Sequence, residues 1–344
     1  MLFLACFVVI VFGMRAASDI ITPIVIAFII SVLFIPLQRW LLDRNIPNWL
    51  TMLIVLLIIL LVVSGLISIS VVSITQFVNR IPQYSASLQG MVDDIVVLVE
   101  SLPFEVTNFL TLESFDVSQI LNVGGNLLGG VLDTVSNWGV VVLLVAFMLA
   151  DFAKLPEKLE IIYKNRAEDN GIGDLMLSIR RYLTITTTTG VLVGVINAIL
   201  LAAAGVDFAV LWGIFSFLMN YIPSLGIIIS FVPPAVLALL EFGWQRALIV
   251  GGGFILINFV IENILKPRVM GEGLNISPLF IMLSLVLWTF VLGPIGTILA
   301  VPLTLIATKL LLESSEEMQW LSVLMTSDIN HPISNKKRKS KKND

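Results

Sequence analysis

Long apolar runs separated by short polar segments make up most of the 344-residue chain. The uncharged stretches cover residues 20–38, 45–79, 134–150, 182–206, 208–240, 247–261 and 273–308. A helix needs about 20 apolar residues to cross a bilayer once. Because several runs reach this length and others exceed it well, the pattern predicts an all-α, polytopic helical membrane protein with about six to eight full spans.

The composition narrows the choice of function. Hydrophobic residues make up 58% of the chain and charged residues 13%, whereas a soluble domain carries about 25% charge. His331 is the single histidine and Cys6 the single cysteine, so Ser-His or Cys-His nucleophiles and Cys/His metal clusters are excluded. The sequence also lacks the Gly-Lys-Ser/Thr loop that binds phosphate. We therefore expect no catalytic residue, no metal site, no cofactor and no ATP-driven transport by this chain alone.

The charged residues predict the orientation in the membrane. Residues 80–133 contain one basic residue against seven acidic ones, whereas 151–181 contain six basic residues and 336–342 six more. Lys and Arg close to spans favour the cytoplasmic side. This rule places the two basic segments inside and the acidic segment outside, and the number of spans then puts both termini in the cytoplasm. Beside a membrane, we expect the basic tail to contact anionic lipid headgroups and no nucleic acid.

These boundaries divide the chain into six segments. We expect N-terminal transmembrane helices over 1–78, an acidic extracytoplasmic segment with amphipathic helices over 79–135, a transmembrane helix over 136–152, a cytoplasmic amphipathic segment over 153–181, a transmembrane core over 182–313 and a polar, basic tail over 314–344.

Two regions of the core are too long for one span and are interrupted near their middle. The region 208–240 contains a Pro/Gly break from Pro223 to Gly226, and the region 273–312 contains one from Gly293 to Gly296. Membrane helices tolerate such breaks where the backbone lines a cavity or is buried in protein, so each region is predicted to form a helical hairpin with a Gly/Pro tip. Hairpins of opposite orientation would form an inverted repeat with the pathway near the tips. Two ordinary spans joined by a proline turn are the alternative.

A polar face lies between the two hairpins. Asn258, Glu262 and Lys266 follow one another at four-residue steps and therefore share one helix face. A carboxylate inside a membrane helix costs about 2.5–3.5 kcal/mol on insertion scales, so the position of Glu262 within an apolar run requires an explanation. The alternatives are an ion pair with Lys266, a place in a pathway or in proton coupling, and a subunit contact. Asp207 and Glu241 end apolar runs, where interfacial solvation would explain them.

A stripe of small residues occupies one face of the span 182–206. Its members recur at four-residue spacing and are Thr186, Gly190, Gly194, Ala198 and Ala202. Such faces let another helix approach closely. Close packing within the chain is one interpretation, and an oligomer contact or pathway lining is the other.

Four segments of the C-terminal half carry motifs with prolines and glycines at set positions, namely 205–212, 220–226, 262–271 and 292–303. Together with the N-terminal stretch 23–48, they resemble the autoinducer-2 exporter family of bacterial permeases. The resemblance covers roughly residues 16–313. It implies a multi-pass protein of the bacterial inner membrane that forms a homo-oligomer. Some family members export the quorum signal autoinducer-2, and others are proposed sodium/proton antiporters.

We therefore predict a secondary or facilitative exporter of a small polar metabolite, similar to autoinducer-2 by resemblance. The alternatives are a sodium/proton antiporter, for which Glu262 is the best-placed acid, and a non-transporting membrane scaffold. The predicted pathway residues are Asn220, Pro223, Ser224, Gly226, Asn258, Glu262, Asn263, Gly293, Pro294 and Gly296.

Overall fold

The computed structural model describes residues 2–100, 138–152, 171–223, 225–270 and 277–314. Within these ranges the ordered elements are helices, and no strand occurs. This confirms the predicted all-α fold class. Outside the described residues lie 153–170 of the predicted cytoplasmic segment 153–181, most of the acidic segment, Ser224 and the residues after Ser314. The remaining residues 171–181 of that segment form the start of the helix Gly171–Ala204.

The N-terminal helices pack around a seam of aliphatic side chains. α1 (Leu2–Ala16) leads directly into α2 (Ser18–Leu42), and α3 (Asn48–Glu100) follows after a short turn. Ala27 of α2, Val55 of α3 and Val145 of the helix Trp138–Phe152 are fully buried in one cluster. The buried Gln38 side chain donates to the Leu149 carbonyl at 3.0 Å, which ties the helix Trp138–Phe152 to α2.

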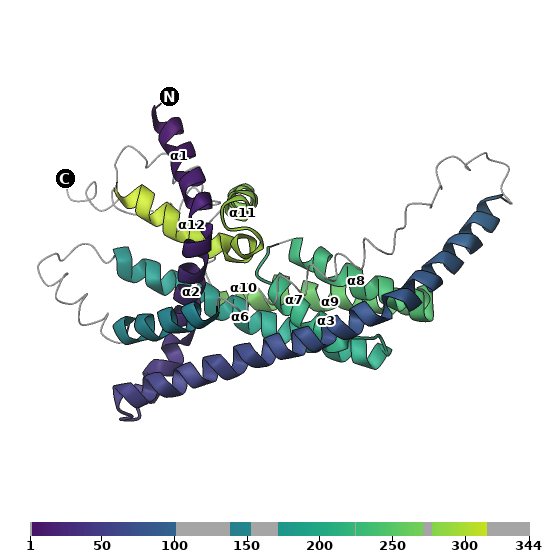
Figure 1. Ribbon diagram of the computed structural model, residues 1–344, viewed down its shortest axis with the longest axis horizontal. Coiled ribbons are helices and arrows are strands. Elements are labelled where there is room, and N and C mark those ends of the chain that lie inside the picture. The colour runs from purple at the N-terminus through teal and green to yellow at the C-terminus, as the bar shows by residue number, and fades with distance from the viewer. Residues whose placement is uncertain (1, 101–137, 153–170, 224, 271–276, 315–344) are drawn as a thin grey trace, which may run out of the picture.

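α3 does not end where its composition changes. The predicted boundary at residue 78 falls inside one continuous helix, and the amphipathic stretch 88–100 forms the end of that helix. In Figure 1, α3 extends along most of the length of the molecule and passes α6, α7 and α9 on its way. Its first half packs on α2, and a later part contacts α7 and α8.

The C-terminal core begins with four helices that pack as neighbours in sequence. They are α6 (Gly171–Ala204), α7 (Ala209–Met219), α8 (Leu225–Phe242) and α9 (Trp244–Val260). A π-helical turn, η2 (Ile261–Leu265), follows α9, and α10 (Lys266–Met270) continues from it. α6 and α7 approach closely because glycines face each other: a Cβ on Gly194 would lie 2.7 Å from the Gly213 carbonyl oxygen.

Both predicted Gly/Pro breaks separate two packed helices. The break in 208–240 separates α7 from α8, and the break in 273–312 separates α11 (Pro278–Leu292) from α12 (Pro294–Ser314) at Gly293, whose φ is 68°. At each tip a glycine lies against the preceding helix, because a Cβ on Gly226 or on Gly296 would collide with a backbone carbonyl. The two tips therefore share a feature that only glycine permits.

Among the described residues, five helices are long and apolar enough to cross a membrane. They are Ser18–Leu42, Asn48–Tyr84, Met176–Ala204, Leu225–Phe242 and Trp244–Leu265. Shorter apolar helices of 10–17 residues accompany them, including Trp138–Phe152 and Ala209–Met219. The architecture is that of a polytopic helical membrane protein. To reach six to eight spans, some of the shorter helices must cross as well.

Candidate functional site

A small pocket lies between the first hairpin tip and the end of α9. Its volume is about 20 Å³, which is room for about one water molecule. Half of the lining residues carry a polar side chain, although the surrounding helices are strongly apolar. The lining residues are Ser216, Met219, Asn220, Ile222, Pro223, Gly226, Ile227, Ser230, Asn258 and Glu262.

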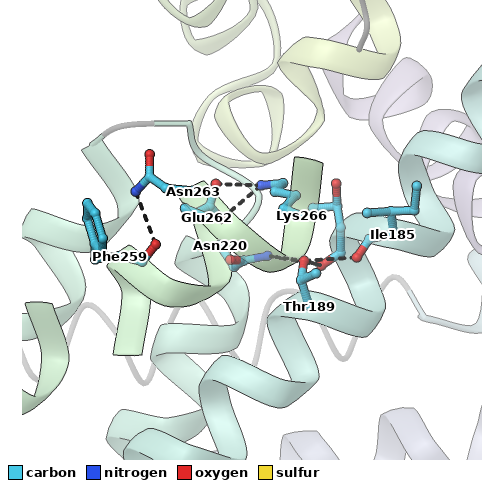
Figure 2. Close-up of polar contacts among 8 residues, drawn as sticks. Ile185, Thr189, Asn220, Phe259, Glu262, Asn263 and Lys266 are labelled. Carbon is cyan, nitrogen blue, oxygen red and sulfur yellow. Dashed lines mark hydrogen bonds and ion pairs between the residues drawn. The ribbon is translucent and has the colours of Figure 1, made fainter. Parts of the chain in front are cut away.

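Asn220 ties the tip of the first hairpin to α6. It is the C-terminal cap residue of α7. Its Nδ2 donates to the Thr186 carbonyl at 3.0 Å and lies 3.3 Å from the Thr189 hydroxyl. Figure 2 shows this amide directed toward Thr189, with Glu262 nearby on η2. The next residue, Tyr221, shares a 2.6 Å hydrogen bond with the Thr187 hydroxyl, so α6 holds the tip at two points.

Glu262 lies in the π-helical turn and forms an ion pair along its own helix. The Lys266 Nζ lies 2.9 Å from each carboxylate oxygen of Glu262, and both side chains are mostly buried. Pro267 follows and has no backbone N–H to donate, so the preceding helical turn loses one regular hydrogen bond. Single π-turns inside α-helices are frequent at functional sites. The sequence favoured a regular helix here, and the π-turn is new information.

Two prolines in α8, on one side of the pocket, remove regular helix hydrogen bonds. Pro233 and Pro234 lie inside α8, and neither can donate to the carbonyl four residues earlier. Those carbonyls belong to Ile229 and Ser230, and Ser230 lines the pocket. The pocket therefore combines hydroxyl, amide and carboxylate groups beside a proline-interrupted helix, which is a surface suited to hydrogen bonding.

The structure brings together part of the predicted pathway. Asn220, Pro223, Gly226, Asn258 and Glu262 line one pocket. The exposed Asn263 points away from it and donates to the Phe259 carbonyl at 3.1 Å, as Figure 2 shows. Gly293, Pro294 and Gly296 lie at the second tip and are not among the lining residues. The hairpins meet elsewhere, where Ile222 packs against Leu285 of α11 and Ala300 of α12.

Most of the small-residue stripe faces α7 of the same chain. Gly190 lies against Asn220 and Phe217, while Gly194 and Ala198 lie against Gly213. Thr186 is fully buried, but Ala202 at the far end of the stripe is exposed. The close approach of α6 and α7 therefore accounts for four of the five positions.

A second polar cluster lies at the other end of α7. Arg80 of α3 forms an ion pair with Asp207. The Tyr84 hydroxyl lies 3.1 Å from Asp207 and 2.8 Å from Glu241 at the end of α8. Interfacial solvation alone is therefore not the whole explanation of these two acids. We call Arg80, Tyr84, Asp207 and Glu241 the Tyr84 cluster.

Sequence reasoning missed several polar contributors. Ser216 and Ser230 line the pocket but stood among apolar residues without a motif. Tyr84 joins elements that are distant in sequence, and no local pattern indicates such a contact. A usable signal existed for Ser216, because it lies four residues before Asn220 and therefore on the same helix face.

Comparison with known proteins identifies the family. The family model described as AI-2E family transporter matches residues 4–316. The AI-2 transport protein TqsA of Escherichia coli K12 is 32% identical over 328 residues, covering 95% of both chains. A putative transport protein of Haemophilus influenzae is 35% identical over 319 residues, covering 91% of both chains. The putative transport protein YhhT of Escherichia coli K12 is 29% identical and covers 94% of this chain and 92% of its own. This chain belongs to the AI-2E family of transporters.

Proposed function

We propose that the protein exports a small polar metabolite, similar to autoinducer-2, through the pocket at the first hairpin tip. The observation that carries this proposal is the pocket itself, because it concentrates polar groups between helices that are otherwise apolar. The name of TqsA, an AI-2 transport protein, supports the choice of solute. The proposal includes a bacterial inner membrane, cytoplasmic termini and assembly into a homo-oligomer.

The charges at the pocket favour an uncharged solute. Glu262 is the one ionisable residue of the lining, and Lys266 neutralises it at 2.9 Å. A site that exchanges sodium for protons needs a carboxylate that is free to bind either ion, and this carboxylate already has a cation beside it. Hydrogen-bonding groups then provide the recognition, as in polar sites of small-molecule pockets. This favours metabolite export over sodium/proton antiport.

Transport requires the pocket to widen. A space for about one water molecule is too small for a metabolite, so the structure corresponds to a closed state. We expect the tip from Asn220 to Pro223 to move. The contacts that hold it against α6 are two side-chain hydrogen bonds, which can break and re-form. Breaking these contacts would open the pocket without unpacking the Gly194 crossing between α6 and α7.

The proposal is tested by flux of autoinducer-2 from loaded proteoliposomes. Wild-type protein should release the solute well above the rate of empty vesicles. The variant Asn220→Leu should release it several-fold more slowly, because leucine cannot replace the polar lining group that would bind the solute, while the Tyr221 contact still holds the tip against α6. The matched control is Asn263→Leu, at an exposed amide outside the pocket.

The possible results separate the three functions. Solute release that Asn220→Leu slows and Asn263→Leu does not supports the export pathway. Proton movement evoked by sodium, without solute release, would support antiport. A protein that moves neither solute nor protons, and whose cellular function survives Asn220→Leu, would support the scaffold.

A further inference from the structure

A buried amide on α6 has no hydrogen-bond partner. Asn197 is 0% exposed, and within the described part of the chain neither its Nδ2 nor its Oδ1 is paired. An unpaired buried polar group destabilises the folded state, and native proteins contain few of them. An apolar residue of similar shape would avoid this cost, so the presence of an amide at this position needs a reason other than packing.

Helix geometry places Asn197 in the seam between α7 and α9. A Cβ on Gly194 would lie 2.7 Å from the Gly213 carbonyl of α7, and Leu200 lies against Gly253 of α9. Three residues rotate a helix by about 300°. Asn197 is three residues after Gly194 and three before Leu200, so it projects midway between those two contacts.

An apolar cluster closes the space beyond the pocket. It is built from Leu201, Val206, Trp212, Leu237, Ala238, Val250 and Phe254, with the ring of Tyr84 at its edge. We call it the α6–α9 apolar cluster. It separates the pocket, which contains Glu262, from the Tyr84 cluster. A solute that crosses between these two polar regions has to pass the apolar cluster.

Asn197 belongs to the layer where the pocket ends and the cluster begins. The large cluster residues of α6, α7 and α9 are Leu201, Trp212 and Phe254. One helical turn toward the pocket, the same helices carry Asn197, Ser216 and Asn258. From the cluster residue to the polar residue, the residue number falls by four on α6 and rises by four on α7 and α9. This is expected because α6 runs antiparallel to α7 and α9.

The three polar residues of this layer differ in their bonding. Ser216 donates to the Trp212 carbonyl at 2.8 Å, and Asn258 donates to the Phe254 carbonyl at 2.8 Å. Both amide atoms of Asn197 are left free. A primary amide offers two donors and one acceptor oxygen, so Asn197 has the largest unused bonding capacity in the layer.

We propose that Asn197 binds the transported solute at the entrance to the α6–α9 apolar cluster. This inference rests on the proposed export function and adds a residue outside the closed pocket. An amide that both donates and accepts suits an uncharged solute with hydroxyl or carbonyl groups. When the solute enters, it satisfies the amide, and the cost of the unpaired group in the closed state favours solute binding.

The test compares Asn197→Leu with wild type in two measurements. Leucine has a similar shape and removes the unpaired amide, so the melting temperature in detergent should stay the same or rise. Autoinducer-2 flux from proteoliposomes should fall at least ten-fold. Thr188→Val, at an exposed position of the same helix, is the control and should change neither. A merely structural Asn197 predicts unchanged flux.

A second readout does not depend on the choice of solute. Cys6 is the single cysteine, so Cys6→Ser with Asn197→Cys leaves one thiol at this layer. A small membrane-impermeant methanethiosulfonate reagent should modify it in vesicles, because the route opens to water. Wild-type flux of Asn197→Leu or an unreactive Asn197→Cys would overturn the inference. Wild-type protein that fails to move autoinducer-2 would instead overturn the proposed solute, and the thiol measurement would still decide the role of Asn197.

Discussion

The ammonium nitrogen of Lys266 lies 2.9 Å from both carboxylate oxygens of Glu262. The Lys266 side chain is 16% exposed and that of Glu262 28%, so the pair is partly shielded from solvent. Each charge therefore stabilises the other at the end of the apolar helix Trp244–Leu265. The ion pair explains how a carboxylate can lie beside the pocket at the end of an apolar helix.

The two charges of this pair should contribute to stability in a non-additive way. We expect Glu262→Gln or Lys266→Met alone to lower the free energy of unfolding by about 1–2 kcal/mol, because one charge is left unpaired in a partly buried place. The double variant should lie closer to wild type than the sum of the two changes. Thermal unfolding of purified protein in detergent measures this, and strictly additive losses would argue against the pairing.

The tip of the first hairpin should tolerate nothing larger than glycine at position 226. Gly226→Ala places a methyl group against the Met219 carbonyl, and overpacking of this kind costs about 1–3 kcal/mol. We expect a lower melting temperature together with slower solute flux. Gly252→Ala is the matched control, because no atom lies within 4 Å of its Cβ position. Equal behaviour of the two variants would contradict the tip geometry.

Substitutions in the middle of the small-residue stripe should lower the melting temperature more than substitutions at its end. Gly194→Ala should destabilise the fold, because a Cβ there would lie 2.7 Å from the Gly213 carbonyl oxygen. Ala202→Leu, at an exposed position, should leave the melting temperature within a few degrees of wild type. Comparison of both melting temperatures and of oligomer size by light scattering checks this. Loss of the oligomer in Gly194→Ala without loss of stability would point to a subunit contact instead.

The Tyr84 hydroxyl should couple energetically to Glu241. The oxygen atoms are 2.8 Å apart, and hydrogen bonds to charged groups contribute about 1.5–3 kcal/mol; partial exposure of the cluster reduces this to about 1 kcal/mol. We expect Tyr84→Phe and Glu241→Gln each to lower stability, with a non-additive double variant. Additive effects in this double-mutant cycle would mean that the two side chains do not interact.

The sequence predicted the features that depend on local pattern. Run length and uncharged stretches predicted the helical membrane fold, and the Gly/Pro breaks predicted the positions where α8 and α12 begin. Four-residue spacing predicted that Asn258 and Glu262 share a face, and both line the pocket. These features follow from helix geometry and from the cost of polar groups in lipid. Both act within one segment, so the local sequence is enough to predict them.

Features that depend on how helices meet could not be predicted in the same way. Asn263 was predicted as a pathway residue, yet in the π-helical turn its side chain is exposed. The contacts of Tyr84 join α3 to α8 across 157 positions. Gly293, Pro294 and Gly296 of the second tip were predicted to line the pathway with the first tip, whereas the hairpins meet through Ile222, Leu285 and Ala300. Packing between distant segments decides each of these cases.

Blocking the pocket by chemical modification tests its role as the solute route most directly. In a Cys6→Ser background, Ser230→Cys places a single thiol in the pocket lining. Autoinducer-2 flux from proteoliposomes is measured before and after complete modification by a bulky methanethiosulfonate reagent, with Thr188→Cys as the exposed control. The account predicts that modification at 230 reduces flux to the level of empty vesicles and that modification at 188 leaves it unchanged. Unchanged flux through fully modified Ser230→Cys would contradict it.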